Sequence, residues 1–335
     1  AHDLGNPPFG HAGEEAISKY FSEGEGKKFQ KAVSEEEWND LTHFEGNANA
    51  FRLLTHQFKG RRKGGFALTY TTLASLIKYP YGSDAILQGK KKFGYFQAEK
   101  ETFLEIAQEL GLRQIENNPL SYARHPLVFL VEAADDICYE IMDIEDAHKL
   151  KIIDTNTTFD LLTGFFDPAE DRKFFNKMGE VFKEVTDINE QVAYLRASVI
   201  SKLIRETANV FIQNQQQILN GDFSQSLIKA MTGKPKQAFE ACQRLAVKDI
   251  YNHRSVVKIE LTGFNVLGTL LDEFITAIFN PGSDYSKKVL SILPSQFSVE
   301  EGSFYKKTMS VVDFVSGMTD LYAVDLYKDM RGINL

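Results

Sequence analysis

The stretch HPLVFLVEAADDICYEIMDIEDAHKL, residues 125–150, decides the fold class. Apolar residues recur along it at helical spacing, and Pro126 stands where the first turn of a helix tolerates proline. Similar segments precede and follow it, whereas the alternation that is typical of strands is scarce. The sequence therefore predicts an all-α fold, with residues 91–97 as a short extended piece or hairpin edge.

Local signals place several helix ends. Ser34 followed by Glu37 forms a capping-box pattern at the start of one helical segment, and Gly46 interrupts or bends that segment. Another helix should stop at Pro80, because proline cannot continue the hydrogen-bonded ladder. Gly111 is a plausible C-cap for the helix that begins near Glu99.

Composition limits the classes of function. The 335 residues are 43% hydrophobic, enough for a sizeable core, and carry a net charge of −8. An acidic chain is a poor candidate for unselective nucleic-acid binding, so an anionic substrate would need local positive charge or a metal. The only cysteines, Cys138 and Cys242, form no CxxC pair, and no apolar run reaches the roughly 18 residues of a membrane span. We expect a cytoplasmic protein without a membrane partner.

His2 and Asp3 are a candidate metal-binding pair. Neighbours on a regular helix diverge by about 100°, so a shared target requires a helix end or turn. Imidazole nitrogen and carboxylate oxygen suit Mn, Fe, Ni, Zn or Mg. The alternative is an ordinary pair at a helix end.

Asp135, Tyr139 and Asp143 form a polar line, because they are spaced i, i+4 and i+8 at about 3.6 residues per turn. Their apolar flanks indicate a largely buried helix, in which an unpartnered charge is costly. A metal ion and a polar ligand would provide partners for these three side chains. The alternative is the solvated face of an amphipathic helix.

His11 and Glu14 are three residues apart after the turn NPPFG, residues 6–10. At this spacing on a helix the carboxylate can orient the imidazole and raise its basicity, which makes a general acid or base. The alternative is a satisfied histidine beside a helix N-terminal glutamate.

Positive charge for an anion is available at several points. The runs KGRRKGG (residues 59–65) and KKK (residues 90–92) are basic islands, although charge runs are usually solvated. Lys78 lies between apolar residues in LIKYPY and is more suited to a specific target. No phosphate-binding GxxxxGK[ST] loop, GxSxG elbow or HExxH zinc motif is present.

Five blocks taken together resemble a known family. In chain order they are HDLGNPPFGHAGEEAI, HFEGNANAFRLLT, LTYTTLASLIKYP, HPLVFLVEAADDICYEIMDIEDA and VVDFVSGMTDLYAVDLY. The chain resembles the dGTPase-like deoxynucleoside triphosphate triphosphohydrolases of the HD-domain superfamily. The resemblance implies one helical HD domain over residues 1–335, with a metal-binding and catalytic core in residues 1–150 and additional C-terminal helices in residues 151–335.

The resemblance also implies a mononuclear divalent metal, with Mn²⁺ or Mg²⁺ preferred over Fe, Ni or Zn. His2 and Asp3 match the family's His-Asp pair, and Asp135 matches its distant aspartate. The family's first metal-ligand histidine is expected upstream of Ala1.

The family reaction splits a deoxynucleoside triphosphate into a deoxynucleoside and inorganic triphosphate. His11 matches the catalytic histidine, and Glu14 would hold and polarise it. Positions that would contact the phosphates or the rest of the substrate are Asn6, Glu45, Asn47, Lys78 and Tyr79. Asp143 would accept a hydrogen bond from the sugar 3′-hydroxyl, and Tyr139 would pack where a 2′-hydroxyl would lie.

Two other functions stay open. A different HD phosphohydrolase would release phosphate or pyrophosphate, and a nucleotide- or DNA-sensing regulator would bind without turnover. The resemblance further implies a homo-oligomer, often a hexamer, and regulation by a nucleotide or single-stranded DNA. The preferred base and the native metal are not predicted.

Overall fold

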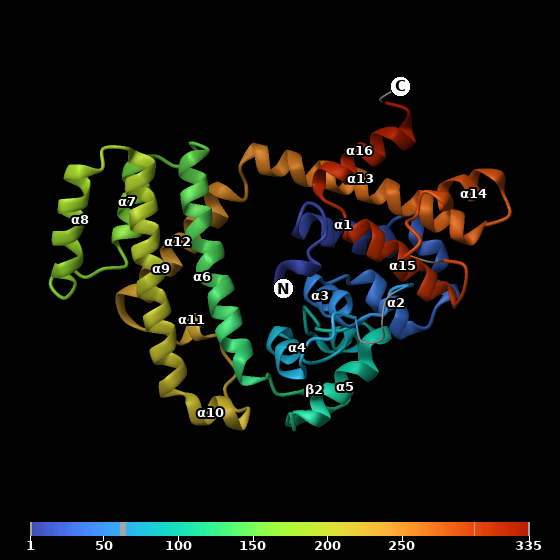
Figure 1. The fold of residues 1–335 in the computed structure, drawn as a ribbon, viewed down its shortest axis with the longest axis horizontal. Helices are drawn as coiled ribbons and strands as arrows, with labels where there is room; N and C mark the ends of the chain where they lie inside the picture. Colours follow the sequence, from blue (N-terminus) through green and yellow to red (C-terminus); the bar gives the residue numbers. More distant parts are fainter. Residues whose placement is uncertain (1, 61–64, 298, 334–335) are drawn as a thin grey trace. The chain divides into compact units, whose positions relative to one another are not determined.

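The structure, a computed structural model, describes residues 2–60, 65–297 and 299–333, and it is almost entirely helical (Figure 1). The prediction of an all-α fold is confirmed. Strands in the described part of the chain are limited to an antiparallel pair, β1 (Gln114–Asn117) and β2 (Leu120–Tyr122).

The chain divides into two compact units. Unit 1 consists of Ala1–His125 together with Lys258–Leu335, and unit 2 consists of Pro126–Val257. These units are defined by packing, so the predicted single functional domain with a division at residue 150 stays a prediction.

The first segment of unit 1 alternates short helices with tight turns. Its helices are η1 (His2–Gly5), α1 (His11–Ser22), η2 (Glu25–Ala32), α2 (Glu35–Thr42), α3 (Gly46–Thr55), α4 (Tyr70–Leu76), η3 (Ser83–Gln88), η4 (Gln97–Glu99) and α5 (Lys100–Glu109). The η labels here mark 3₁₀ helices.

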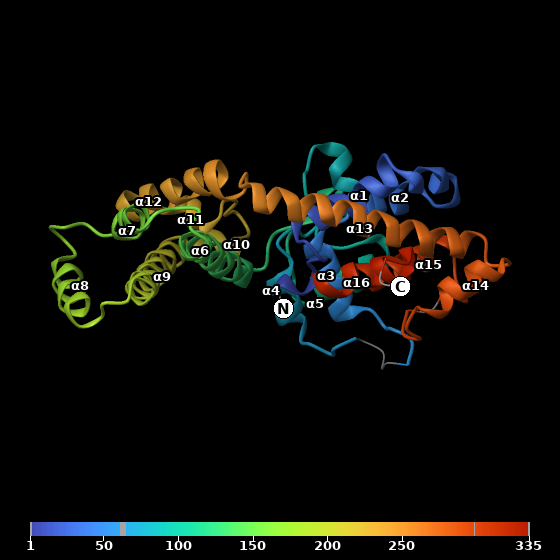
Figure 2. The same cartoon turned by 90° about the horizontal axis from the view of Figure 1, so that it is seen from above.

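The second segment of unit 1 completes its core. Most of α13 (Arg254–Phe279) belongs to it, followed by α14 (Asp284–Ser291), α15 (Phe304–Ser316) and α16 (Asp320–Arg331), which Figure 2 shows near the first-segment helices. Phe21 of α1, Phe274 of α13 and Val312 of α15 share one buried cluster. Residues more than 200 positions apart therefore build a common core.

Helix α13 is long and apolar enough, by length and composition alone, to cross a membrane. Half of its most apolar window is buried, and Leu267, Leu270 and Phe274 on it are fully enclosed. A core helix of a globular unit passes the same test, so this helix is weak support for a membrane span.

The predicted helix ends are confirmed except that of α4, which ends at Leu76 rather than at Pro80. Ser34 Oγ accepts from the Glu37 amide at 3.2 Å, and Glu37 Oε2 accepts from the Ser34 amide at 2.9 Å, which completes the capping box. Helix α2 ends at Thr42 and α3 begins at Gly46, so the glycine marks an interruption. Gly111, with a φ of 59°, follows α5 in the left-handed conformation.

One extended segment was placed wrongly. The hairpin lies at residues 114–122, whereas residues 91–97 contribute a single isolated bridge, between Tyr95 and Gly82. Phe93, Tyr95 and Phe96 are almost fully buried, so burial of the aromatic rings holds this segment in place. The dipeptide Asn118–Pro119 was the turn signal that the sequence offered for the true hairpin.

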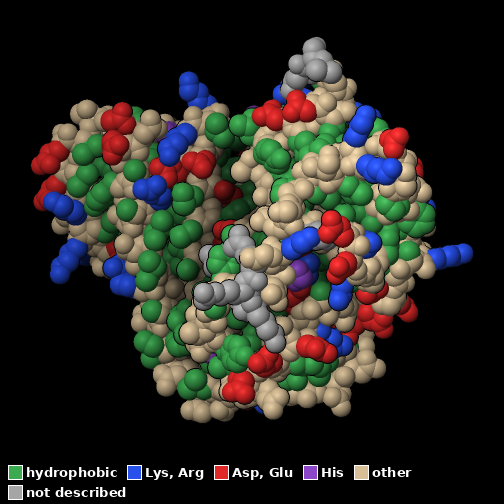
Figure 3. All heavy atoms as spheres, turned by 45° about the vertical axis from the view of Figure 1, so that its right-hand side comes forward, with side chains coloured by type: hydrophobic (Ala, Val, Ile, Leu, Met, Phe, Trp, Pro, Cys, Tyr) green, Lys and Arg blue, Asp and Glu red, His purple; other side chains and the backbone are tan. Residues whose placement is uncertain are grey.

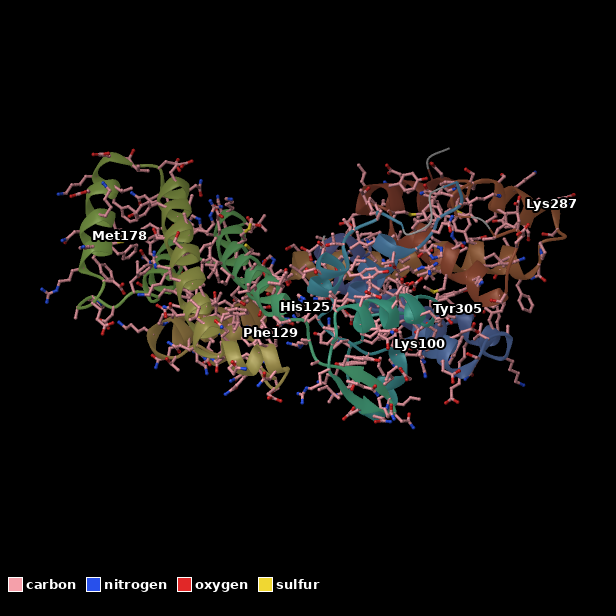
Figure 4. All side chains as sticks on the ribbon, turned by 60° about the horizontal axis from the view of Figure 1, so that its bottom comes forward. Lys100, His125, Phe129, Met178, Lys287 and Tyr305 are labelled. Atoms are coloured by element: carbon pink, nitrogen blue, oxygen red, sulfur yellow. The ribbon has the colours of Figure 1, made fainter. Side chains whose placement is uncertain are left out.

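Unit 2 is a bundle around α6 (Pro126–Lys149) and α9 (Ile188–Gln213), which lie side by side in Figures 1 and 2. Phe129, labelled on α6 in Figure 4, packs edge-on against Phe223 within the buried core. The other helices are α7 (Thr155–Thr163), α8 (Arg172–Glu184), α10 (Gln215–Asn220), α11 (Leu227–Ala230), α12 (Gly233–Leu245) and the π-helical turn η5 (Ala246–Ile250).

Candidate active site

The turn before α1 is held in an unusual backbone conformation. Phe9 and Gly10 have φ values of 66° and 57°, in the left-handed region that side chains disfavour. The Phe9 amide donates to Asp320 Oδ1 at 3.0 Å, and its ring lies so close to Gly263 that a Cβ there would be 2.9 Å away. Strain of roughly 1–3 kcal/mol at such a residue persists only when the surroundings enforce it. The second segment of unit 1 therefore fixes where α1 begins.

His11, the first residue of α1, is paired with Glu14. Its Nδ1 lies 2.8 Å from Glu14 Oε2, and Glu14 Oε1 accepts from the Gly46 amide at 2.7 Å. The hydrogen bond to Glu14 raises the pKa of His11 above 6.5, and burial acts in the opposite direction. The His11 side chain is 76% exposed and that of Glu14 is 13% exposed, so an anchored carboxylate orients a ring whose Nε2 can meet a substrate.

A second polar group stands at the start of α3. Asn47 Nδ2 donates to Glu45 Oε1 at 2.6 Å, and Lys92 Nζ lies 3.4 Å from the same oxygen. Burial raises the pKa of Glu45, and Lys92 counters that effect. Glu45 and Lys92 both influence the pKa of His11, so the two polar groups lie within electrostatic range of each other.

Lys92 is a site residue that the sequence did not single out. It appeared only as the end of the KKK run, which has the composition of a solvated island. The apolar stretch FGYF directly after Lys92 could have identified it, because Lys78 was selected for its similar apolar neighbours.

The turn that carries the predicted metal-binding pair is built against α3. Gly5 in η1 approaches α3 so closely that a Cβ would overlap the Gly46 carbonyl oxygen and the Ala50 amide nitrogen. Asn6 Nδ2 donates to Asp3 Oδ1 at 3.0 Å. A Cβ on Gly46 would lie 2.5 Å from Glu14 Oε1 and 2.8 Å from Asn6 Oδ1. The structure thus brings Asn6 and Asp3 to the same helix terminus as Glu14.

The metal ligands stay a prediction. The side chain of His2 lies outside the described residues, and Asp135 belongs to unit 2 while Asp3 belongs to unit 1. Within the part of the chain that the structure describes, no group of three or more His, Cys, Asp or Glu side chains could hold an ion. The donor chemistry itself, imidazole nitrogen with carboxylate oxygen, fits a divalent transition metal.

Lys78 and Tyr79 lie in unit 1, in the segment after α4. The Tyr79 carbonyl oxygen lies where a Cβ on Gly94 would be. The centroid of the Tyr79 ring is 6.2 Å from that of the Tyr81 ring. Burial raises the pKa of Tyr81, and Glu45 contributes a smaller increase. This segment therefore neighbours the Glu45 group, and the phosphate-binding role of Lys78 stays a prediction.

In unit 2, Asp135, Tyr139 and Asp143 lie on successive turns of α6, as the spacing predicted. The expected burial of this line is wrong for Tyr139, which is 54% exposed. The Tyr251 hydroxyl donates to Asp143 Oδ2 at 2.8 Å. Burial raises the pKa of Asp143, and the bond from Tyr251 lowers it. Tyr251 follows η5 and was not identified from the sequence, because it is 108 positions from its partner.

On the face drawn in Figure 3, basic and acidic side chains are interspersed and form no continuous basic band.

Comparison with known proteins assigns the family. Residues 229–329 match the phosphohydrolase-associated domain. A deoxyguanosinetriphosphate triphosphohydrolase-like protein of Synechocystis sp. is 36% identical over 347 residues, covering 100% of this chain and 76% of the relative. The chain belongs to the dGTPase-like family of HD-domain phosphohydrolases. A protein of the same description from Pseudomonas aeruginosa is 33% identical, covering 99% and 75%, and a Yersinia pestis deoxyguanosinetriphosphate triphosphohydrolase is 30% identical, covering 98% and 76%.

Membership of the dGTPase-like family makes the protein a hydrolase and confirms the family that the five sequence blocks indicated. HD-domain phosphohydrolases generally depend on a divalent metal, which agrees with the predicted type of cofactor.

Proposed function

We propose that the protein hydrolyses deoxynucleoside triphosphates to a deoxynucleoside and inorganic triphosphate, with Mn²⁺ or Mg²⁺ as cofactor. The observation that carries this proposal is the chain of contacts from the Gly46 amide through Glu14 to His11. It is a general acid–base arrangement with an exposed reactive ring, at the helix start that the family uses for its catalytic histidine.

In the proposed reaction water attacks the α-phosphorus, the bond to the 5′-oxygen of the sugar breaks, and the sugar leaves as an alcohol. His11 Nε2 would handle the transferred proton while Nδ1 keeps its contact with Glu14. The hydrogen bond to Glu14 raises the pKa of His11 above 6.5, which favours the protonated ring. Glu14 would fix the ring orientation and stabilise the protonated ring.

His2, Asp3 and Asp135 would hold the metal ion. When bound, the ion would neutralise charge on the α-phosphate. Asn6, which donates to Asp3 Oδ1, would keep one carboxylate oxygen in a fixed direction.

The triphosphate would lie among the polar groups of unit 1. Lys92 and Lys78 would supply positive charge, and Asn47 would donate a hydrogen bond. Glu45 would orient both Asn47 and Lys92, since its Oε1 accepts from each of them. Tyr79 would contact the substrate beside Lys78.

The deoxyribose would meet the polar line of α6. Asp143 would accept from the 3′-hydroxyl, and Tyr251 would hold the Asp143 carboxylate ready for that bond. Tyr139 would occupy the space of a 2′-hydroxyl. A ribonucleotide would then clash, or would lose hydrogen bonds to water without replacement.

The test is a product analysis. The full-length chain is incubated with each dNTP and each NTP, with Mn²⁺ or Mg²⁺, and products are resolved by ion exchange. Triphosphate released from dNTPs supports the proposal. Pyrophosphate or phosphate would identify a different HD phosphohydrolase, and binding without turnover would identify a sensor.

A further inference from the structure

Helices α3 and α15 of unit 1 are joined by two polar contacts one turn apart. Asn49 Nδ2 donates to Ser316 Oγ at 3.2 Å. One turn on, Arg52 donates to both carboxylate oxygens of Asp313, at 2.7 and 2.8 Å. Asn49 and Arg52 are spaced i, i+3 on α3, as are Asp313 and Ser316 on α15, so the two helices meet in antiparallel register.

Helix α15 is itself firmly anchored. The hydroxyl of Tyr305, labelled in Figure 4, donates to Asp40 Oδ2 of α2 at 2.5 Å, and Tyr305 is 3% exposed. Arg52 also binds Glu99 at 2.5 Å, and all three charged groups of that cluster are buried. Buried charge pairs with good geometry resist separation, because either partner alone would be an uncompensated charge. The α3–α15 pair is therefore a rigid frame.

Asn49 connects this frame to the turn that carries the predicted metal pair. The same Nδ2 that faces Ser316 donates to the Gly5 carbonyl at 2.8 Å. Asn49 is completely buried, and within the described part of the chain its Oδ1 accepts no hydrogen bond. A buried amide with an unpaired oxygen lowers stability compared with an apolar residue. The two hydrogen bonds that Asn49 donates therefore suggest a role other than stability.

We propose that Asn49 is a positioning residue, which sets the η1 turn, and with it Asp3 and Asn6, on the first turns of α3. The parts of this proposal that concern turnover and Mn²⁺ affinity rest on the proposed function, whereas the effect on the η1 turn itself does not. The Gly5 carbonyl accepts from Asn49. The Cα of Gly5 packs directly against the α3 backbone at Gly46 and Ala50. Without the Asn49 bond the turn keeps its backbone contact but loses the directional link that fixes its rotation. A displacement of the turn by a fraction of an ångström would misplace the proposed metal ligands while the packing of the turn stays intact.

The test uses Asn49→Leu, which is similar in volume and cannot donate. Amide hydrogen exchange at residues 3–6 should become faster, and the Mn²⁺ dissociation constant should rise by about tenfold, as for a lost supporting contact. With the preferred dNTP, kcat should fall by roughly 100-fold, the size expected from a small misplacement, and KM should change little.

The matched control is Leu54→Ala, also on α3 and buried, but in a core cluster that does not include the η1 turn. It should lower the unfolding midpoint by at least as much as Asn49→Leu, while exchange at residues 3–6 and Mn²⁺ affinity stay at the wild-type level. Ser316→Ala should behave like the control, because the Gly5 contact remains.

If Asn49→Leu and Leu54→Ala shift exchange, Mn²⁺ affinity and kcat alike, Asn49 is merely structural and the proposal is wrong. Should Asn49→Leu fail to fold, Asn49→Ala carries the same expectations. If the wild-type protein turns over no dNTP, the proposed function fails, whereas amide exchange at residues 3–6 still decides the role of Asn49.

Discussion

The turn before α1 in unit 1 and the polar line of α6 in unit 2 hold their functional side chains in different ways. His11 is oriented by Glu14, three residues away, and Glu14 is anchored by a backbone amide. Asp143 is oriented by Tyr251, which comes from the far end of unit 2. The first arrangement is local and visible in the sequence, whereas the second is created only by folding. Substitutions in the two regions should therefore affect catalysis by different amounts and through different kinetic parameters.

The largest effect should come from unit 1. Replacing His11 by Ala removes the proton-transferring ring, and kcat should fall by about 100- to 10,000-fold, the usual range for loss of a general acid or base. Release of triphosphate from dNTPs measures it. The control is His43→Ala: His43 is exposed and, among the residues that the structure describes, bonds only to the end of its own helix, so this variant should retain wild-type kcat. Retention of activity in His11→Ala would remove the basis of the proposed mechanism.

In unit 2, Asp143→Ala should lower kcat/KM by about 10- to 100-fold, because a hydrogen bond to a charged group contributes roughly 1.5–3 kcal/mol. A 2′,3′-dideoxynucleotide should be a poor substrate for the wild type and no worse for the variant. Tyr251→Phe should give a smaller loss, since the carboxylate remains.

The control for unit 2 is Asp146→Ala, a largely exposed carboxylate on the same helix that pairs only with Lys149 in the described structure. It should leave discrimination against the dideoxy substrate unchanged. Equal losses in Asp143→Ala with both substrates would rule out a sugar contact.

Lys92→Ala should have a moderate effect. Loss of one charge-assisted phosphate contact, about 1.4 kcal/mol, corresponds to roughly a tenfold decrease in kcat/KM. Lys91→Ala, the neighbour in the same basic run, is the matched control, and steady-state kinetics at two salt concentrations provide the measurement. Identical behaviour of the two variants would show that Lys92 contributes only general charge.

The smallest effect is a change in pH dependence. Glu14 raises the pKa of His11, so Glu14→Gln should lower that pKa and move the acidic limb of kcat/KM to lower pH. The corresponding stability also has a definite sign. A folded-state pKa above 6.5 means that the His11–Glu14 pair stabilises the fold below about pH 6.5, and this is lost as pH rises through the raised pKa. A pH–rate profile of the two proteins tests it, and an unshifted limb would assign that limb to another group.

The sequence predicted what short-range chemistry determines. Ser34 with Glu37, Gly46 and Pro126 each mark a helix end through the backbone hydrogen bonds of one turn, and all three are in the expected places. The hairpin at residues 114–122 was missed because the aromatic run at residues 91–97 has a stronger strand composition, yet burial of its rings decides its conformation. Tyr251 and the Arg52–Asp313 contact have no local pattern, since each joins segments more than 100 residues apart.

The backbone contact between Gly5 and α3 has a consequence for how this protein can diversify. Where two main chains touch with no side chain between them, their separation cannot be tuned by exchanging residues there. A laboratory-evolution library that randomises Gly5 or Gly46 should yield almost no active clones. New substrate preferences would have to arise from helices such as α6, where the contacts are between side chains and residues can be substituted.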